Sequence, residues 1–264
     1  MNDVIKVAIS KVPEVTLGFW TVKILATTLG ETGGDAVTMS MLHADKHAHN
    51  GGYLIGTGIF LIVFIVAVAA QILAKKFGPW NYWIAIVAST TVGTTMADFA
   101  DRSLGIGYAG GSSILLALLV ASLAIWRISE GSVSVDTVAT PRVEAFYWTT
   151  ILFSQTLGTA LGDWMATTNG FGFDGGALVF TAAIAATAAL YYATDISRVT
   201  LFWAAFILTR PLGATVGDFL DKPNALGGLA LNRYYASALL LVSMLALVTV
   251  FPQRAGSHPS AVRD

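Results

Sequence analysis

Acidic side chains recur at one spacing along an otherwise apolar chain. Each of four tryptophans is followed fifteen residues later by an aspartate: Asp35, Asp98, Asp163 and Asp218. Glu31 lies four residues before the first aspartate, inside the same apolar run. Carboxylates that point toward one axis favour a hard cation such as Mg²⁺, Mn²⁺ or Ca²⁺. We therefore expect these side chains to bind a small ion, and a divalent metal suits them best.

Threonine hydroxyls and one amide accompany the carboxylates. Helix positions three, four and seven apart share a face, which places Thr28 and Thr94 on the faces of the first and second aspartates. The position seven residues after each tryptophan is polar in every copy, and in the third it is Gln155. We expect these groups to assist ion binding. The alternative is that the threonines only pack helices together and the aspartates only cap turns.

Two basic residues lie within apolar runs. Arg210 follows its tryptophan by seven residues and Lys23 follows its own by three. Charges at membrane depth are costly and usually face a bundle interior or a watery cavity. We expect both cations to pair with the carboxylates in one state and to release them in another. The alternatives are a buried Arg–Glu or Arg–Asp pair that locks the bundle, and a Lys23 side chain that snorkels to the interface.

Three of the four histidines gather in the loop after the first apolar run. The loop contains His43, Asp45, His47 and His49. Neutral imidazoles bind Zn²⁺, Mn²⁺, Ni²⁺ or Cu²⁺ readily. The loop is therefore a candidate metal site for capture or release. The alternative is a solvated polar loop, since the other parts of the chain lack this cluster.

The elements that must position these groups form a fourfold repeat. In each copy an aromatic residue precedes Trp, Gly follows Trp by ten positions, and Asp follows that Gly by five, without a gap. A Gly pair and a second apolar run come after each Asp. Such internal repetition indicates repeated structural units. We place these units at about 16–76, 79–128, 144–195 and 199–251.

The composition favours a membrane protein. Of the 264 residues, 55% are hydrophobic and 12% are charged, whereas a soluble domain carries about 25% charged residues. A spanning helix needs about 20 mostly apolar residues. Eight runs qualify: 16–34, 53–74, 80–97, 111–127, 145–162, 177–194, 199–217 and 233–251.

These runs predict an all-α fold that forms one polytopic transmembrane domain of eight helices over residues 1–264. It consists of four parallel two-helix repeats with pseudo-symmetry about the membrane normal, and residues 252–264 form a flexible tail. Lysine and arginine favour cytoplasmic loops. The termini and the loops after even-numbered runs hold nine of them, against four in the loops after odd-numbered runs. Both termini are therefore expected in the cytoplasm.

The composition also excludes several classes of function. The net charge of -1 makes no electrostatic case for nucleic acid. The absence of cysteine excludes disulfides and thiolate metal sites. The chain has no nucleophile with a nearby base, no HExxH motif and no nucleotide-binding loop, so an enzyme is not expected. The expected partners are the lipid bilayer and a small cation or solute, with no cofactor besides a bound divalent metal as substrate.

The four aromatic-Trp units that end in Gly-Asp resemble a bacterial family of uncharacterised membrane-anchored proteins built from a repeat of unknown function. The second unit departs from the pattern with Ala97 before its Asp, and the fourth has Pro211 in place of Thr. The resemblance implies the architecture and a bacterial inner-membrane location, but no activity. The GETGGD segment of the first unit is also loosely similar to the acidic Glu-x-Gly-Asp motifs of repeat-built manganese and calcium exporters.

Three functions fit these observations. The first is a secondary transporter or exporter of a small, divalent cation through an acidic, Thr-lined central cavity. The second is a transporter of a small anionic or organic solute held by Arg210. The third is a non-transporting structural or accessory membrane protein whose polar residues only fix helix packing.

Overall fold

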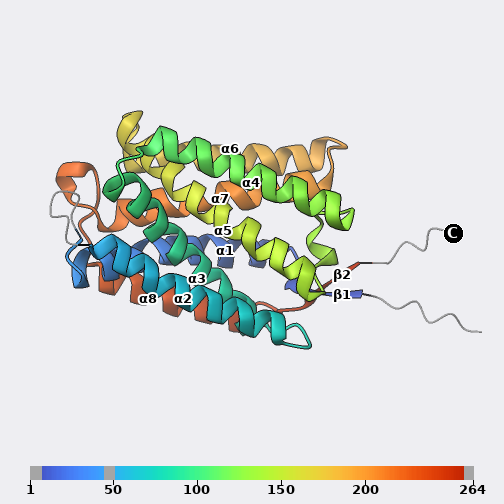
Figure 1. The fold of residues 1–264 in the computed structure, drawn as a ribbon. Helices are drawn as coiled ribbons and strands as arrows, with labels where there is room; N and C mark the ends of the chain where they lie inside the picture. Colours follow the sequence, from blue (N-terminus) through green and yellow to red (C-terminus); the bar gives the residue numbers. More distant parts are fainter. Residues whose placement is uncertain (1–7, 45–50, 259–264) are drawn as a thin grey trace, which may run out of the picture.

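The predicted helices all form in the computed structural model, which describes residues 8–44 and 51–258. The eight long helices of the described residues are α1 (Leu17–Asp35), α2 (Gly52–Leu73), α3 (Pro79–Asp98), α4 (Tyr108–Glu130), α5 (Pro141–Asp163), α6 (Gly172–Ala193), α7 (Arg198–Asp221) and α8 (Arg233–Val250). They run roughly along one direction, with connections at both ends (Figure 1). The prediction of an all-α fold with eight helices is confirmed.

Short elements complete the chain. Helices α1, α3 and α5 continue into π-helical turns, which are η1 (Ala36–Met41), η2 (Phe99–Ser103) and η4 (Trp164–Thr168). Two 3₁₀ turns, η3 (Val135–Thr137) and η5 (Asn224–Leu226), lie in connections between helices. A π-helical turn is wider than an α-helix and is frequent at functional sites. Each of the three here begins directly after one of the repeated aspartates.

The odd-numbered helices form a closed inner ring. Helix α1 contacts α3 and α7, and α5 also contacts α3 and α7. Each even-numbered helix packs outside this ring against the inner helix of the following unit: α2 on α3, α4 on α5, α6 on α7 and α8 on α1. The fourth unit thereby returns to the first, so all four units share one interior.

Glycines ten residues after each tryptophan hold the ring together. A Cβ on Gly30 would overlap Thr90 of α3, and a Cβ on Gly93 would overlap Gln155 of α5. The same overlap arises between Gly158 and Arg210, and between Gly213 and Thr27. Because a residue without a side chain lets two helix backbones approach closely, each glycine docks its helix against the next unit. The inner helices therefore come into close contact at all four glycines.

Apolar surface lies mainly on the outer helices. Five helices of the described residues are long and apolar enough to cross a membrane: α2, α4, α6, α7 and α8. Large aliphatic side chains on the four outer helices remain exposed, such as Ile62, Val120, Leu178 and Leu239. Helices α1, α3 and α5 are richer in Thr and Gly and are largely buried by their neighbours. The arrangement is compatible with a membrane protein whose polar helices are shielded by apolar ones.

The two ends of the chain meet at one end of the bundle. Strand β1 (Ala8–Pro13) pairs antiparallel with β2 (Ala255–His258) (Figure 1). Lys11 of β1 also forms a buried ion pair of 2.6 Å with Glu144 of α5. The predicted flexible tail at 252–264 is therefore wrong for Ala255–His258, because backbone pairing with β1 supplies order that a polar sequence does not signal. Residues 259–264 lie outside the described part of the chain.

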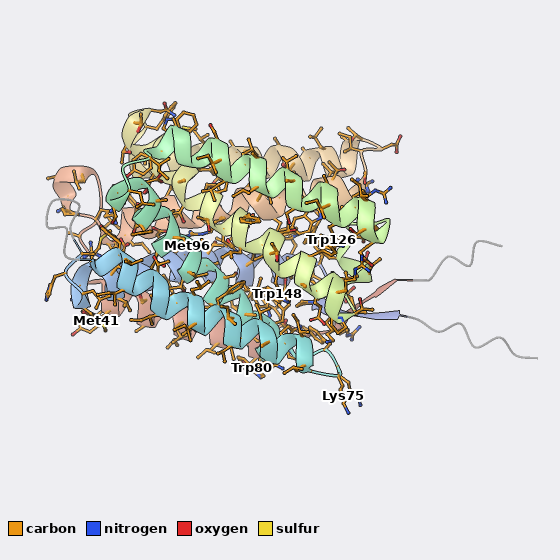
Figure 2. All side chains as sticks on the ribbon, in the orientation of Figure 1. Met41, Lys75, Trp80, Met96, Trp126 and Trp148 are labelled. Carbon is orange, nitrogen blue, oxygen red and sulfur yellow. The ribbon has the colours of Figure 1, made fainter. Side chains whose placement is uncertain are left out.

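The repeated tryptophans and aspartates lie at opposite ends of the inner helices. Trp126 and Trp148 lie toward the end that carries β1 and β2, whereas Met41, just beyond α1, lies at the other end (Figure 2). At the tryptophan end the axis is filled by aromatic rings, and Tyr82 and Tyr147 share a hydroxyl hydrogen bond of 2.7 Å. Both tyrosines are buried. We call the two ends the tryptophan end and the aspartate end.

Candidate functional site

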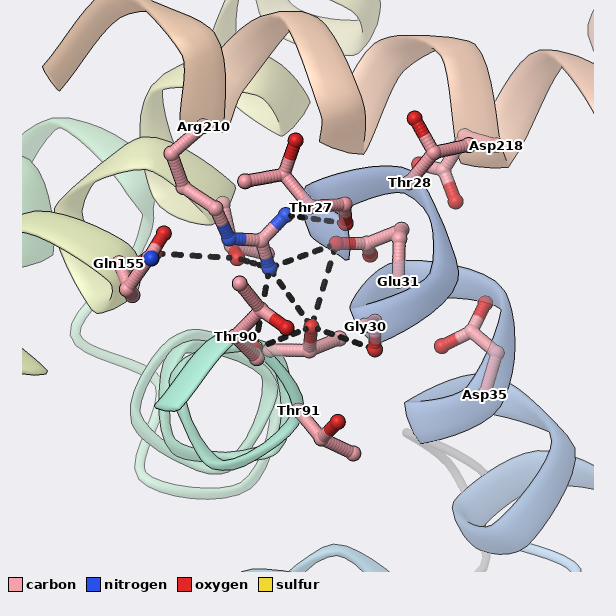
Figure 3. Close-up of polar contacts among 12 residues, drawn as sticks. Thr27, Thr28, Gly30, Glu31, Asp35, Thr90, Thr91, Gln155, Arg210 and Asp218 are labelled. Carbon is pink, nitrogen blue, oxygen red and sulfur yellow. Dashed lines mark hydrogen bonds and ion pairs between the residues drawn. The ribbon is translucent and has the colours of Figure 1, made fainter. Parts of the chain in front are cut away.

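Arg210 is the point at which the four inner helices converge. Its Nη2 donates to Glu31 Oε2 of α1 at 2.9 Å and to Thr94 Oγ1 of α3 at 2.6 Å. The same nitrogen donates to Thr159 Oγ1 of α5 at 2.5 Å. Arg210 itself belongs to α7, and its exposed fraction is 0%. The guanidinium therefore lies on the axis of the ring and contacts every other inner helix (Figure 3).

The repeat explains how these partners reach the axis. Glu31, Thr94 and Thr159 each lie eleven residues after the tryptophan of their unit, and the fourth unit has Ala214 there. A charged or hydroxyl group thus approaches from three units, while the small Ala214 leaves room. In the fourth unit Arg210 reaches the axis instead, from the position seven residues after its tryptophan. The predicted Arg–Glu pairing is present in this conformation.

The first and fourth aspartates share a lysine at the aspartate end. Lys222 follows Asp218 by one helical turn, and its Nζ lies 2.9 Å from Asp218 Oδ1. The same ammonium forms an ion pair with Asp35 of the first unit. Burial disfavours the charged amine, but the carboxylates of Asp218, Asp35 and Asp221 outweigh burial and raise the pKa of Lys222 well above its usual value. Lys222 is therefore a fixed positive charge at neutral pH.

The second and third aspartates share an arginine in the same way. Arg102 Nε lies 2.9 Å from Asp98 Oδ1, and Arg102 Nη2 lies 3.2 Å from Asp163 Oδ2. Tyr53 accepts a further hydrogen bond of 3.3 Å from Arg102 Nη1. Each of the two cations thus bridges the aspartate of its own unit to the aspartate of the next unit.

Sequence reasoning missed Arg102 and Lys222 as parts of the site. In the sequence both contribute only to the loop charges that indicate orientation. A signal was nevertheless present, because each lies four residues after a repeated aspartate, at the same position of the second and fourth units. Residues four apart face the same side of a helix and form ion pairs readily. The bridge to the next unit could not be found in this way, because it depends on which helices are neighbours.

The charges of this region do not balance. We define the axial cluster as five carboxylates and three cations, which are Glu31, Asp35, Asp98, Asp163, Asp218, Arg102, Arg210 and Lys222. When all are ionised, the cluster carries two uncompensated negative charges. Its carboxylates are all buried. Uncompensated charge is expensive away from water, so the cluster favours a further positive charge, either protons or a metal ion.

Three carboxylates come close enough to share one ion. One oxygen from each of Glu31, Asp35 and Asp218 lies within 4.8 Å of the others. Asp35 Oδ1 is buried and has no hydrogen-bond partner among the described residues. Oxygen-only sites of this kind suit hard divalent cations. The predicted convergence of the carboxylates is present for these three, while Asp98 and Asp163 lie with Arg102.

Lys23 does not join the carboxylates. Its Nζ lies 3.4 Å from Thr209 Oγ1 and 4.1 Å from the centroid of the Phe206 ring. No carboxylate among the described residues forms an ion pair with it, so the predicted pairing is not made in this conformation. The snorkelling alternative is also wrong here, because the exposed fraction of Lys23 is 0%. The side chain instead extends between inner helices, on the tryptophan side of Arg210.

Gln155 and Thr28, which were also predicted to assist ion binding, differ in their hydrogen bonding. Gln155 is buried in the ring beside Gly93, and neither of its side-chain amide atoms has a hydrogen-bond partner in the described chain. The Thr28 hydroxyl donates to Ile24 O of its own helix at 3.0 Å. The Thr28 hydroxyl is therefore satisfied within its own helix in this conformation, whereas the Gln155 side-chain amide retains free hydrogen-bonding capacity.

The histidine loop is only partly described. His43 follows η1 with a positive φ of 51°. The other predicted ligands of this loop, Asp45, His47 and His49, lie outside the described residues. Metal binding by the loop thus stays a prediction from the sequence, independent of the axial cluster.

Comparison with known proteins identifies the repeat. Four stretches of the chain match one family model, described as Repeat of Unknown Function (DUF347), at residues 18–77, 81–132, 146–197 and 201–252. Together they cover most of the chain, which therefore belongs to this family. No curated protein and no solved structure matched.

Proposed function

We propose that this member of the DUF347 repeat family is an integral membrane protein that transports a small cation, with a divalent metal as the favoured substrate. The observation that carries the proposal is the axial cluster, in which buried carboxylates outnumber cations at the centre of a bundle shielded by apolar helices. Ionisable groups at membrane depth commonly mark ion pathways. Carboxylates of this cluster would bind the ion, and the hydroxyls of Thr94 and Thr159 would assist.

The contacts of Arg210 favour a cation over an anionic solute. Its guanidinium is already neutralised by Glu31 and donates hydrogen bonds to the hydroxyl oxygens of Thr94 and Thr159. An anion would have to displace these partners and would meet the uncompensated carboxylates nearby. A cation instead meets a net negative charge. We therefore rank transport of an anionic or organic solute by Arg210 below transport of a cation.

Transport would need a change from this closed conformation. The carboxylates of the axial cluster are buried, and aromatic rings fill the axis at the tryptophan end. Repeat-built transporters alternate access by moving one repeat against another. The glycine contacts follow the same order around the ring, which supports four parallel units related about the membrane normal. Movement of two units against the other two would open the aspartate end by separating Lys222 from Asp35.

The orientation follows the basic residues. We propose eight spanning helices in a bacterial inner membrane, with both termini and the tryptophan end on the cytoplasmic side. Lysine and arginine are more frequent in the segments at that end. The polar helices α1, α3 and α5 would cross the membrane as members of the ring, where α2, α4, α6 and α8 separate them from lipid.

Flux measurement tests the proposal. Purified protein in liposomes is expected to move Mn²⁺, Mg²⁺ or Ca²⁺ across the membrane, and Glu31→Gln and Asp35→Asn are expected to lower the rate at least about tenfold, because each removes a ligand charge. Glu144→Gln is the matched control, since Glu144 is also a buried, ion-paired acid but lies off the axis beside Lys11.

Two outcomes would contradict cation transport. The first is no metal-dependent flux from folded wild-type protein, which would favour a non-transporting scaffold whose ion pairs only fix packing. The second is equal loss of flux in Glu144→Gln and in the axial variants when all of them fold, which would show that the axial carboxylates have no special role. Size-exclusion profiles of each variant separate folding from function.

A further inference from the structure

We infer that Glu31, Asp35 and Asp218 form the primary site for a divalent cation, and that the Lys222 ammonium is the tethered occupant that this cation displaces. The opposite half of the aspartate end, where Arg102 joins Asp98 and Asp163, is by contrast a permanent ion pair. The inference rests on the proposed function and makes it specific, since it assigns the ion to one half of the cluster.

Geometry singles out this half. The three carboxylates offer oxygens within 4.8 Å of one another, a spacing that one ion of 2.0–2.6 Å bond length can span. Lys222 Nζ already lies among two of them, with Asp218 Oδ1 at 2.9 Å and an ion pair to Asp35. Asp35 Oδ1 is buried without a hydrogen-bond partner in the described chain. The site thus already contacts one cation, the Lys222 ammonium, and keeps a free ligand atom for another.

The charges match a divalent ion once Lys222 leaves. Glu31, Asp35 and Asp218 carry three negative charges, of which Arg210 compensates one through its contact with Glu31. Two negative charges remain, equal and opposite to the charge of one Mg²⁺, Mn²⁺ or Ca²⁺. While Lys222 is present only one remains, so a divalent ion and the ammonium together would leave an excess of positive charge in a buried site.

Lys222 can leave without moving its backbone. It is the first residue after α7, where its N–H donates to Asp218 O and its carbonyl accepts from Ala230 N, both at 2.9 Å. Its side chain lies at the aspartate end, next to the exposed segment that contains η5. A lysine is a point charge on a flexible stem and makes no bidentate contact that would hold it. Rotation of this one side chain, whose Nζ also lies 4.0 Å from Asp221 Oδ1, would therefore vacate the site.

The other half differs in its cation and in its carboxylates, although Asp98 Oδ2 is likewise buried without a hydrogen-bond partner in the described chain. Arg102 contacts two different aspartates through separate nitrogens, and Tyr53 accepts from a third. The positions equivalent to Glu31 are Thr94 and Thr159, and no group of three converging carboxylate oxygens among the described residues includes Asp98 or Asp163. Removal of Arg102 would leave two charges, but its planar fork is held by several partners at once. This half is suited to join the second and third units.

Calorimetric titration of Mn²⁺ into the purified, detergent-solubilised protein tests the inference. Lys222→Gln is expected to tighten Mn²⁺ binding at least about tenfold, because the competing charge is gone. Lys222→Arg is expected to weaken it, since a guanidinium can hold both aspartates at once. Arg102→Gln removes the same charge from the other half and is expected to change binding by less than about threefold.

Further variants complete the test. Asp35→Asn in the Lys222→Gln background is expected to abolish the gain, and Lys76→Gln, on an exposed loop, serves as the neutral control. Equal tightening by Lys222→Gln and Arg102→Gln would overturn the inference, as would no change with either. If Mn²⁺ binding responds to these variants as expected but liposomes show no flux, the proposed site is supported and transport is rejected. Flux that is unaffected by Asp35→Asn and Lys222→Gln would reject the site alone.

Discussion

At the scale of single residues, the units differ where they meet the axis. Eleven residues after tryptophan the chain has Glu31, Thr94, Thr159 and Ala214, and only the fourth unit brings an arginine to the centre. The contacts of Arg210 show the consequence, because one guanidinium is shared by three other helices. A buried charge of this kind depends on its counterion. The pair of Arg210 and Glu31 is therefore expected to act as a unit.

Removal of one partner of this pair should be costly. Glu31→Gln or Arg210→Gln is expected to lower the free energy of unfolding by about 3–5 kcal/mol, because each leaves an uncompensated buried charge. The double variant should lose clearly less than the sum of the two. Equilibrium unfolding of the detergent-solubilised protein measures all three. Additive losses would show that the two side chains do not depend on each other.

At the scale of elements, glycines bring the backbones of neighbouring inner helices close together. Each glycine ten residues after tryptophan faces the residue seven after tryptophan on the next inner helix. Thr27, Thr90, Gln155 and Arg210 occupy that facing position. Each glycine that allows two inner helices to approach closely thus also positions the polar residue of the neighbouring helix. The contacts that pack the inner helices together therefore also position the polar residues of the site.

Two glycines of α1 offer a matched comparison. A Cβ at Gly30 would overlap the side chain and backbone of Thr90, whereas a Cβ at Gly33 would meet nothing within 4 Å. Gly30→Ala is expected to lower the free energy of unfolding by about 1–3 kcal/mol through overpacking. Gly33→Ala is expected to raise it by up to about 1 kcal/mol through helix propensity. Thermal unfolding of both variants measures the difference, and equal effects would contradict the close contact.

At the scale of the whole molecule, the chain forms a closed circle of units. Helix α8 packs on α1, and β1 pairs with β2, so the first and last units are joined as the others are. Lys222 bridges the fourth unit to the first in the way that Arg102 bridges the second to the third. The order of the units in the chain is then less important than their order around the ring.

A circular permutant tests this closure. Joining the native ends and reopening the chain between α6 and α7 places the fourth unit first but keeps every contact of the ring. The permutant is expected to elute as the parent does and to unfold within about 5 °C of it. A permutant reopened inside α5 interrupts an inner helix and is expected not to fold. Failure of both permutants alike would indicate that the ring needs its native order of synthesis.

The sequence alone determined the helices, the four units and the residue types of the site. Helix length and apolar content are local properties, and a repeat with constant spacing shows its own period. The glutamate, the aspartates and the buried arginine could therefore be named, and the family match agrees with the repeat. The i, i+4 relation of Lys222 to Asp218 was equally local and was available from spacing.

Only the tertiary structure decided which of these residues meet. The ring order brings Glu31 to Arg210, 179 positions away, while Lys23, on the same helix, contacts Thr209 and the ring of Phe206. Pairing with β1 likewise orders Ala255–His258. Such contacts depend on the direction of each helix face and on the neighbours across the axis. Neither can be read from spacing within one unit, because a repeat predicts the same surroundings for every copy and the site arises where the copies differ.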